Sequence, residues 1–128
     1  MRIAIDGPAG AGKSTAARMV AETLEYTYLD TGAMYRAVAF VLMERGGVAL
    51  LDSDDMAAAV ASRVNVTAAG RVLVDGRDVT DRIRTSEVAE ATPHVAKAPA
   101  VRAALVARQR DLIARGNWVI EGRDIGTV

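Results

Sequence analysis

The sequence predicts an α/β domain in which a parallel sheet carries a phosphate-binding loop and a small antiparallel lobe is inserted between the sheet strands. Three observations support this prediction. Residues 7–14, Gly-Pro-Ala-Gly-Ala-Gly-Lys-Ser, match the pattern G-x-x-x-x-G-K-[ST] in full. An apolar run at 3–5 precedes this motif and a helical pattern over 16–24 follows it, which is the strand, loop, helix order that the motif needs. Valines alternate with polar residues within 64–84, as in half-buried antiparallel strands.

Apolar spacing and helix-end signals place the remaining elements. Four further helices are expected, at 33–45, 54–63, 87–96 and 99–115, together with two further buried strands, at 26–29 and 118–120. Asp52-Ser53 can cap the helix over 54–63, and Pro99 suits a first helical position. The dipeptides Ala69-Gly70 and Asp75-Gly76 favour hairpin turns. We therefore expect a first part of the core at 1–50, an inserted lobe at 51–98 and a return to the core at 99–128.

The composition is that of an ordinary soluble domain with one core, since 51% of the 128 residues are hydrophobic and 25% are charged. Sixteen Lys and Arg balance sixteen Asp and Glu, so no net field favours nucleic acid or a membrane surface. The chain has no cysteine and one histidine, which excludes a disulfide framework and a thiolate metal site. The longest apolar run, at 37–43, is too short for a signal peptide or a membrane span, so a cytoplasmic location is expected.

The loop motif indicates how a triphosphate would be bound. Its glycines let the backbone approach a ligand closely, so that N–H groups converge on phosphate at the start of a helix. Lys13 is expected to reach the β- and γ-phosphates, Ser14 to coordinate Mg²⁺, and Thr15 to lie near the α-phosphate. The expected ATP-binding residues are Gly7, Pro8, Ala9, Gly10, Ala11, Gly12, Lys13, Ser14 and Thr15. The plainer alternative is a glycine-rich turn that binds nothing.

Four later stretches could build a site for a phosphate acceptor, at 30–36, 83–85, 99–102 and 121–127. With Asp-Thr-Gly-Ala-Met-Tyr-Arg in the first and Glu-Gly-Arg-Asp-Ile-Gly-Thr in the last, the sequence closely resembles the N-terminal part of bacterial cytidylate kinases over all 128 residues. The resemblance implies the P-loop nucleoside monophosphate kinase fold and transfer of the γ-phosphate of ATP to CMP or dCMP, with Mg²⁺. It also implies a monomeric full-length enzyme whose remaining core strands and lid lie beyond Val128.

The resemblance assigns roles to individual residues. Arg36 and Arg123 match the arginines that hold the acceptor phosphate, a task suited to planar guanidinium groups, and with Lys13 they are the candidate catalytic residues. Thr31 and Tyr35 match positions beside the acceptor nucleotide.

Arg102 and Asp124 match the residues that read the base. A carboxylate can accept a hydrogen bond from cytosine N4, whereas uracil reverses the donor and acceptor pattern and leaves polar groups mismatched. The substrate-binding set for CMP is therefore Thr31, Tyr35, Arg36, Arg102, Arg123 and Asp124.

Glu121 resembles the carboxylate that orients magnesium through water in such kinases, and Asp6 is a weaker candidate for the same task. No general base is needed, because a phosphate monoester has a second pKa near 6 and is largely ionised at pH 7. Catalysis is then mostly positioning and charge neutralisation.

Plainer explanations exist for each of these residues and are kept open. The arginines at 36 and 102 can be solvated helix residues, Arg123-Asp124 a loop ion pair, and Asp30 only a helix cap. Pro93 stands where the family often has a serine near cytosine, so that Thr92 or His94 would have to replace it.

Other functions are also possible. They are another small-molecule P-loop kinase, a GTPase-like switch, for which no N-K-x-D stretch is found, and a non-catalytic nucleotide-binding fragment.

In the fold that the resemblance implies, the strand before the phosphate-binding loop lies in the middle of the sheet. Residues 1–128 alone would therefore leave one side of Arg2–Asp6 unpaired, and we expect poor stability or association, with very low turnover.

Overall fold

The computed structural model describes residues 1–6 and 13–122. Three parallel strands form the central sheet in the order β1 (Arg2–Asp6), β6 (Trp118–Gly122) and β2 (Thr27–Asp30). The register pairs Asp6 with Gly122 and Asp30 with Glu121, so the three strands end at one common edge. The long segment between β2 and β6 leaves this sheet and returns to it beside its own starting strand, which confirms the predicted α/β fold with an insertion.

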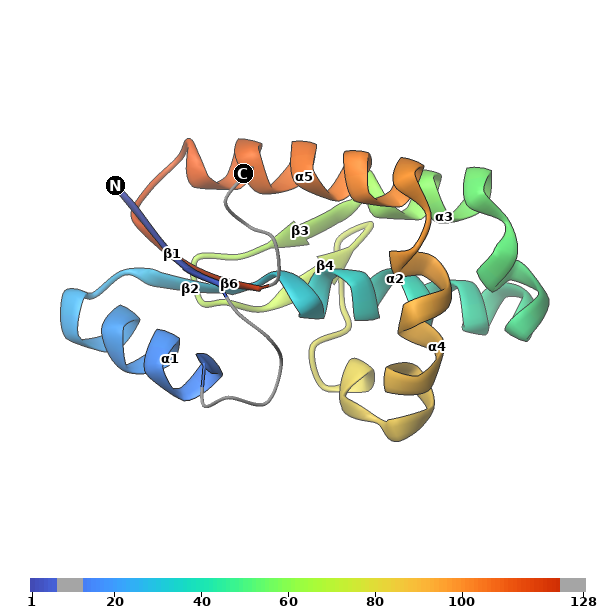
Figure 1. Cartoon of the computed structure of the whole chain (residues 1–128), viewed down its shortest axis with the longest axis horizontal. Helices are drawn as coiled ribbons and strands as arrows, with labels where there is room; N and C mark the ends of the chain where they lie inside the picture. Colours follow the sequence, from blue (N-terminus) through green and yellow to red (C-terminus); the bar gives the residue numbers. More distant parts are fainter. Residues whose placement is uncertain (7–12, 123–128) are drawn as a thin grey trace.

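The helices α1 (Lys13–Leu24) and α5 (Pro99–Ile113) lie on opposite sides of the sheet (Figure 1). Beneath α1, Ala17, Ala21 and Val119 form a small buried cluster. Trp118 and Ile120 alternate with Val119 along β6, so they point to the other face and join the larger core.

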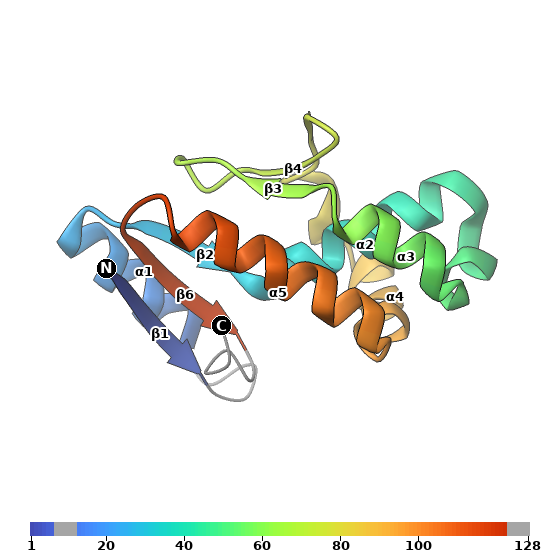
Figure 2. The same cartoon turned by 90° about the horizontal axis from the view of Figure 1, so that it is seen from above.

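The segment between β2 and α5 contains both helices and a second sheet. In chain order its elements are α2 (Thr31–Gly46), the 3₁₀ helix η1 (Gly47–Asp52), α3 (Asp54–Ala61), β3 (Val64–Val66), β4 (Val72–Val74), β5 (Arg77–Asp78), the 3₁₀ helix η2 (Arg82–Arg84) and α4 (Ser86–Ala96). The strands β3, β4 and β5 pair antiparallel. Asp75 and Gly76 join β4 to β5 with φ angles of 52° and 79°, as the predicted two-residue turn requires. Figure 2 shows the β3–β4 hairpin on the far side of α5 from β1.

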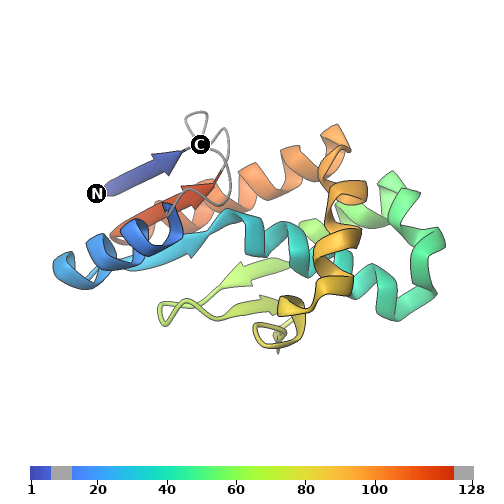
Figure 3. The ribbon, with the colours of Figure 1, turned by 60° about the horizontal axis from the view of Figure 1, so that its bottom comes forward.

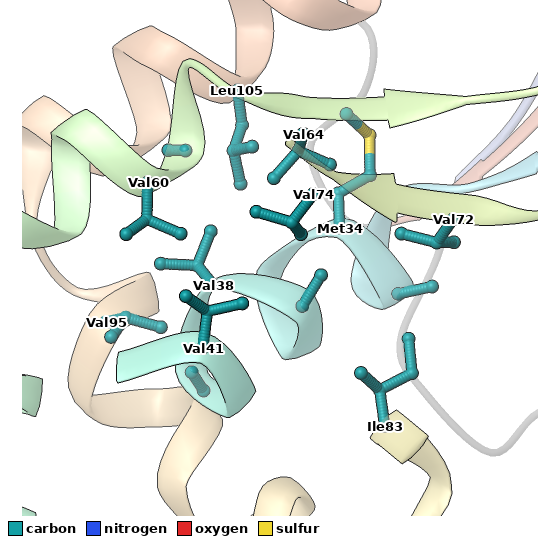
Figure 4. Close-up of a cluster of buried hydrophobic side chains, with 14 of the residues drawn as sticks. Met34, Val38, Val41, Val60, Val64, Val72, Val74, Ile83, Val95 and Leu105 are labelled. Carbon is teal, nitrogen blue, oxygen red and sulfur yellow. The ribbon is translucent and has the colours of Figure 1, made fainter. Parts of the chain in front are cut away.

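One large core joins the inserted segment to α2 and α5. Val38 and Val41 of α2 pack with Val60 of α3 and Val95 of α4, while Leu105 of α5 lies near Val64 (Figure 4). This cluster contains buried residues from Leu29 to Ile120, so it spans all three segments expected from the sequence. Figure 3, with the bottom of the molecule forward, shows α4 crossing the line of α2 while α1 lies in front of the parallel strands.

Several helix ends differ from those expected. The helix α2 begins at Thr31, earlier than the predicted residue 33, because the Asp30 carboxylate accepts a hydrogen bond from the Ala33 N–H at 3.2 Å. The helix α3 ends at Ala61, because Arg63 N bonds the Val60 carbonyl in a tighter turn that leads into β3. The helix α5 ends at Ile113, two residues before the predicted end.

Two helix caps give a matched stability test. Thr85 accepts from Val88 N at 3.2 Å at the start of α4, whereas Ser53 precedes α3 without a side-chain capping bond. We expect Thr85→Ala to lower the free energy of unfolding by about 1 kcal/mol and Thr85→Ser to restore it, because a capping bond satisfies an otherwise orphaned helix N–H. Ser53→Ala should change it by less than about 0.5 kcal/mol. Urea unfolding of the three variants measures this, and an equal loss for Thr85→Ala and Ser53→Ala would contradict it.

The strand β1 is an edge strand within the described residues, since β6 pairs with one of its sides and no described strand pairs with the other. This agrees with the expectation that one side of Arg2–Asp6 has no partner strand here. Ile3 and Ile5 are half-buried, and Ala4 is exposed. No helix within 1–6 and 13–122 has the length and apolar character needed to span a membrane.

Candidate nucleotide site

The expected phosphate-binding loop starts where β1 reaches the carboxyl edge of the sheet and ends where α1 begins at Lys13. Several predicted site residues lie outside the described residues, namely Gly7, Pro8, Ala9, Gly10, Ala11, Gly12, Arg123 and Asp124. The same holds for the side chains of Asp6, Lys13 and Ser14. Thr15 is exposed in the first turn of α1. The described backbone of β1 and α1 therefore flanks the predicted ATP-binding loop in the chain.

Glu121 lies at this edge, on the central strand, and is only 5% exposed. Its Oε1 accepts a hydrogen bond from the Tyr28 hydroxyl at 3.4 Å, and its backbone carbonyl accepts from Thr31 Oγ1 at 3.0 Å. The Arg18 guanidinium lies 5.0 Å from the centre of the Tyr28 ring. A buried carboxylate needs such polar partners to offset its lost hydration. These contacts connect β6 to β2 and to the start of α2.

Asp30 and Arg36 form an ion pair at the start of α2. Arg36 Nη2 donates to Asp30 Oδ2 at 3.2 Å, and the two side chains are 25% and 17% exposed. The other carboxylate oxygen, Oδ1, accepts from Ala33 N. The same carboxylate therefore caps the helix and fixes the guanidinium of the predicted phosphate-binding arginine.

Tyr35 on α2 is half-buried and lies within range of the charge of Arg102 on α5. Burial raises the pKa of the Tyr35 hydroxyl above its usual value, and the nearby charge of Arg102 partly opposes this rise. The hydroxyl is consequently neutral at physiological pH and can both donate and accept. Arg102 is exposed near the start of α5. The charge of Arg102 therefore acts on Tyr35, although the two residues are 67 positions apart.

The model of the cytidylate kinase family matches residues 3–128. This chain belongs to that family. It is 46% identical, over 99% of its length, to the cytidylate kinase of Limosilactobacillus fermentum and 51% identical, over 98%, to that of Pelotomaculum thermopropionicum. It covers 57% and 58% of those two relatives, so it spans less than two thirds of their length.

A longer relative carries a second activity in its name. The bifunctional pantoate ligase/cytidylate kinase of Synechococcus sp. is 48% identical over 98% of the chain, which covers 24% of that protein. The family assignment confirms the resemblance seen in the sequence and the P-loop nucleoside monophosphate kinase fold expected from it.

The described residues suit a magnesium ion that arrives with a nucleotide. They contain no group of three or more His, Cys, Asp or Glu side chains that could hold a metal ion by themselves. Mg²⁺ in kinase sites typically keeps several waters and uses one or two protein ligands beside the substrate phosphates. One buried carboxylate at the edge, Glu121, fits that arrangement, with Ser14 as the ligand expected from the loop motif.

A cavity of about 440 Å³ reaches this edge, where Asp30 and Ala33 are among the residues that line it. It separates β2 from the β3–β4 turn, where Thr27 Oγ1 donates to the Ala68 carbonyl at 3.2 Å. Of the predicted acceptor stretch 83–85, Arg84 lines this cavity, Ile83 is fully buried and Thr85 caps α4. That stretch therefore has structural roles that account for two of its three residues.

The residues near Pro93 have partners within the protein. Pro93 lies inside α4, Thr92 Oγ1 donates to the Val88 carbonyl at 2.7 Å, and His94 Nδ1 lies 3.8 Å from Asp52. His94 is 48% exposed, in keeping with a surface helix residue. The hydroxyl hydrogen of Thr92 is used by its own helix, so Thr92 could offer a base only its acceptor lone pairs.

Reasoning from the sequence missed two contributors to this site. The sequence places Asp30 in the acceptor stretch 30–36, with a helix cap as the plainer explanation, but does not indicate that it is a partner of Arg36. It gives no role to Tyr28, which contacts Glu121 across 93 positions. The Asp30–Arg36 pair joins residues six apart, whereas pairs on one helix face are three or four apart. A helix-cap carboxylate followed by an arginine late in the second turn is the one signal that could have indicated the pair.

Proposed function

We propose that the full-length protein that contains this chain transfers the γ-phosphate of ATP to CMP or dCMP, giving ADP and CDP or dCDP. One observation supports it most strongly. The start of α2, with Thr31 and the oriented Arg36, meets the end of β6 at the same sheet edge from which β1 leads into the phosphate-binding motif. A donor and an acceptor site at one edge are what in-line phosphoryl transfer needs.

The roles within this proposal follow from charge and reach. An acceptor phosphate oxygen attacks the γ-phosphorus while the bond to the β–γ bridging oxygen breaks and ADP leaves. Lys13 and the loop amides hold the transferred group, and Arg36 with Arg123 holds the acceptor. Mg²⁺, bound through Ser14 and through a water on Glu121, would neutralise charge on the phosphates.

The nucleobase would be read by Arg102 and Asp124, and residues 51–98 would form the lobe that closes on the nucleotide. Tyr35, held near Arg102, would line the path between the base and the phosphate. We further propose that the protein acts in pyrimidine nucleotide metabolism, in the cytoplasm and as a monomer. The chemistry of small anionic substrates accords with the balanced charge of the chain.

A comparison of acceptors tests this proposal. With the full-length protein, ATP and Mg²⁺, we expect ADP release with CMP or dCMP to exceed that with UMP or AMP by at least 100-fold in kcat/KM, because mismatched polar groups in a base site are heavily penalised. Asp124→Asn should reduce the preference for CMP over UMP by roughly tenfold, since it removes an acceptor matched to cytosine N4. Equal rates with UMP, unchanged by Asp124→Asn, would contradict the base-reading assignment and favour another P-loop kinase. Absence of turnover with every acceptor would favour a nucleotide-binding role without catalysis.

A further inference from the structure

Asp30 uses its two carboxylate oxygens for two different tasks. Oδ1 accepts from the Ala33 N–H and starts α2, while Oδ2 accepts from Arg36 Nη2 at the same 3.2 Å distance. Because the helix fixes the carboxylate through one oxygen, the other oxygen holds a fixed position toward the arginine. A flexible side chain is thereby held in one geometry before any ligand arrives.

Gly32 leaves the space in which this pair sits. A Cβ atom at Gly32 would come 3.2 Å from Asp30 Oδ1 and 3.4 Å from Arg36 Nη1, closer than ordinary van der Waals contact for the first of these. Gly32 is not among the residues with positive φ, so its backbone conformation does not itself call for glycine. The need for a glycine here comes from the pair beside it.

We propose that Asp30 is a positioning residue that presents the Arg36 guanidinium to the acceptor phosphate. This rests on the proposed function, in which Arg36 binds that phosphate. The guanidinium has five N–H donors in a rigid plane, and one contact with Asp30 leaves donors for the phosphate oxygens. Fixing that plane removes the conformational entropy that a free arginine would lose on binding.

The carboxylate also has an unfavourable effect, since its negative charge repels an incoming phosphate. If repulsion dominated, removing the charge would improve acceptor binding. Orientation should dominate, because Asp30 is hydrogen-bonded to both the helix N–H and the cation, and because misplacement of a reacting group by about 1 Å can cost 100-fold in rate. Whether removal of the Asp30 charge weakens or strengthens acceptor binding therefore decides between orientation and repulsion.

Asp30→Asn in the full-length protein separates capping from positioning. Asparagine caps helices as well as aspartate, but once its oxygen accepts from Ala33 N, its NH₂ group faces the arginine and the ion pair is lost. We expect kcat/KM for CMP to fall about tenfold, mainly in kcat, with the KM for ATP and the thermal midpoint unchanged. Arg45→Gln, which breaks an exposed ion pair with Asp75 at the far end of α2, is the control and should leave both kinetic constants unchanged.

The double variant tests whether Asp30 acts through Arg36. In an Arg36→Ala background, Asp30→Asn should have no further effect on kcat/KM, whereas a merely structural role would give the same loss in both backgrounds. Wild-type kinetics for Asp30→Asn, tighter CMP binding, or an equal loss in both backgrounds would overturn the proposal while leaving the role of Arg36 intact. Unchanged CMP kinetics for Arg36→Ala alone would overturn the role of Arg36 and this proposal with it.

A glycine substitution gives an independent test of the same unit. Gly32→Ala should disturb the pair and reproduce the loss in kcat/KM for CMP to within a few-fold. Gly116→Ala is its matched control, since a Cβ there would meet only Trp118 Nε1 at an ordinary 3.6 Å. Full activity of Gly32→Ala would count against the proposal, because the pair would then tolerate displacement.

Discussion

Replacement of Arg36 by alanine in the full-length protein is expected to lower kcat/KM for CMP by about 10² to 10³, the usual cost of removing one preorganised charge-stabilising donor. The KM for ATP should change little, because Arg36 lies on α2 and the proposed ATP-binding motif lies in sequence between β1 and α1. The fold should persist, since Asp30 still caps α2 through Ala33. Steady-state ADP release, with CMP and ATP varied in turn, measures the effect.

Arg45→Ala is the matched control for that experiment. Arg45 lies in the last turn of the same helix, roughly 13 Å along the axis from Arg36 at 1.5 Å per residue. Its side chain is 41% exposed and lies 3.7 Å from Asp75, a surface pair of small energetic value. Equal losses for the two variants would show that any charge on α2 matters and would remove Arg36 from the site.

Leu105→Ala is expected to give the largest loss of stability. Leu105 is fully buried on α5 and lies near Val60 and Val64 in the core shared by α3 and β3 (Figure 4). Truncation of a buried leucine leaves a cavity and costs about 2–5 kcal/mol. For a protein of this size class, that lowers the thermal midpoint by roughly 10 °C. Denaturant unfolding and thermal scans of the full-length protein measure both quantities.

Leu24→Ala provides the comparison for that variant. Leu24 is 43% exposed at the end of α1, so its truncation removes little buried area. We expect a change below about 0.5 kcal/mol in the free energy of unfolding. A loss for Leu105→Ala as small as that for Leu24→Ala would mean that α5 does not pack on the lobe as described.

The sequence predicted the elements well because periodicity and end signals are local. Pro99 does begin α5, and Asp75-Gly76 does turn between β4 and β5. Even the burial of Trp118, expected as core, follows from its apolar neighbours. Element ends moved by two residues where a side-chain cap or a tighter turn, neither visible in the apolar pattern, set the boundary.

The site was predicted less completely, for a physical reason. The contact of Thr31 with the Glu121 carbonyl and that of Tyr28 with the Glu121 carboxylate depend on strand register, which no local pattern specifies. The influence of the Arg102 charge on Tyr35 likewise depends on how α5 packs relative to α2. Only the family resemblance indicated that Thr31, Tyr35, Arg102 and Glu121 belong to one site, and it said nothing of Tyr28 or of Asp30 as a partner of Arg36.

Because α2 is one continuous helix, a mutation in its buried part can affect the site residue near its start. Arg36 lies near its start, and Ala37, Val38 and Leu42, which follow on the same helix, are completely buried in the core. A substitution among these buried residues would shift the whole helix and move the Arg36 guanidinium with it. Temperature-sensitive variants with substitutions at these positions are therefore expected to show a raised KM for CMP at the permissive temperature. This change should be seen before the amount of folded protein falls.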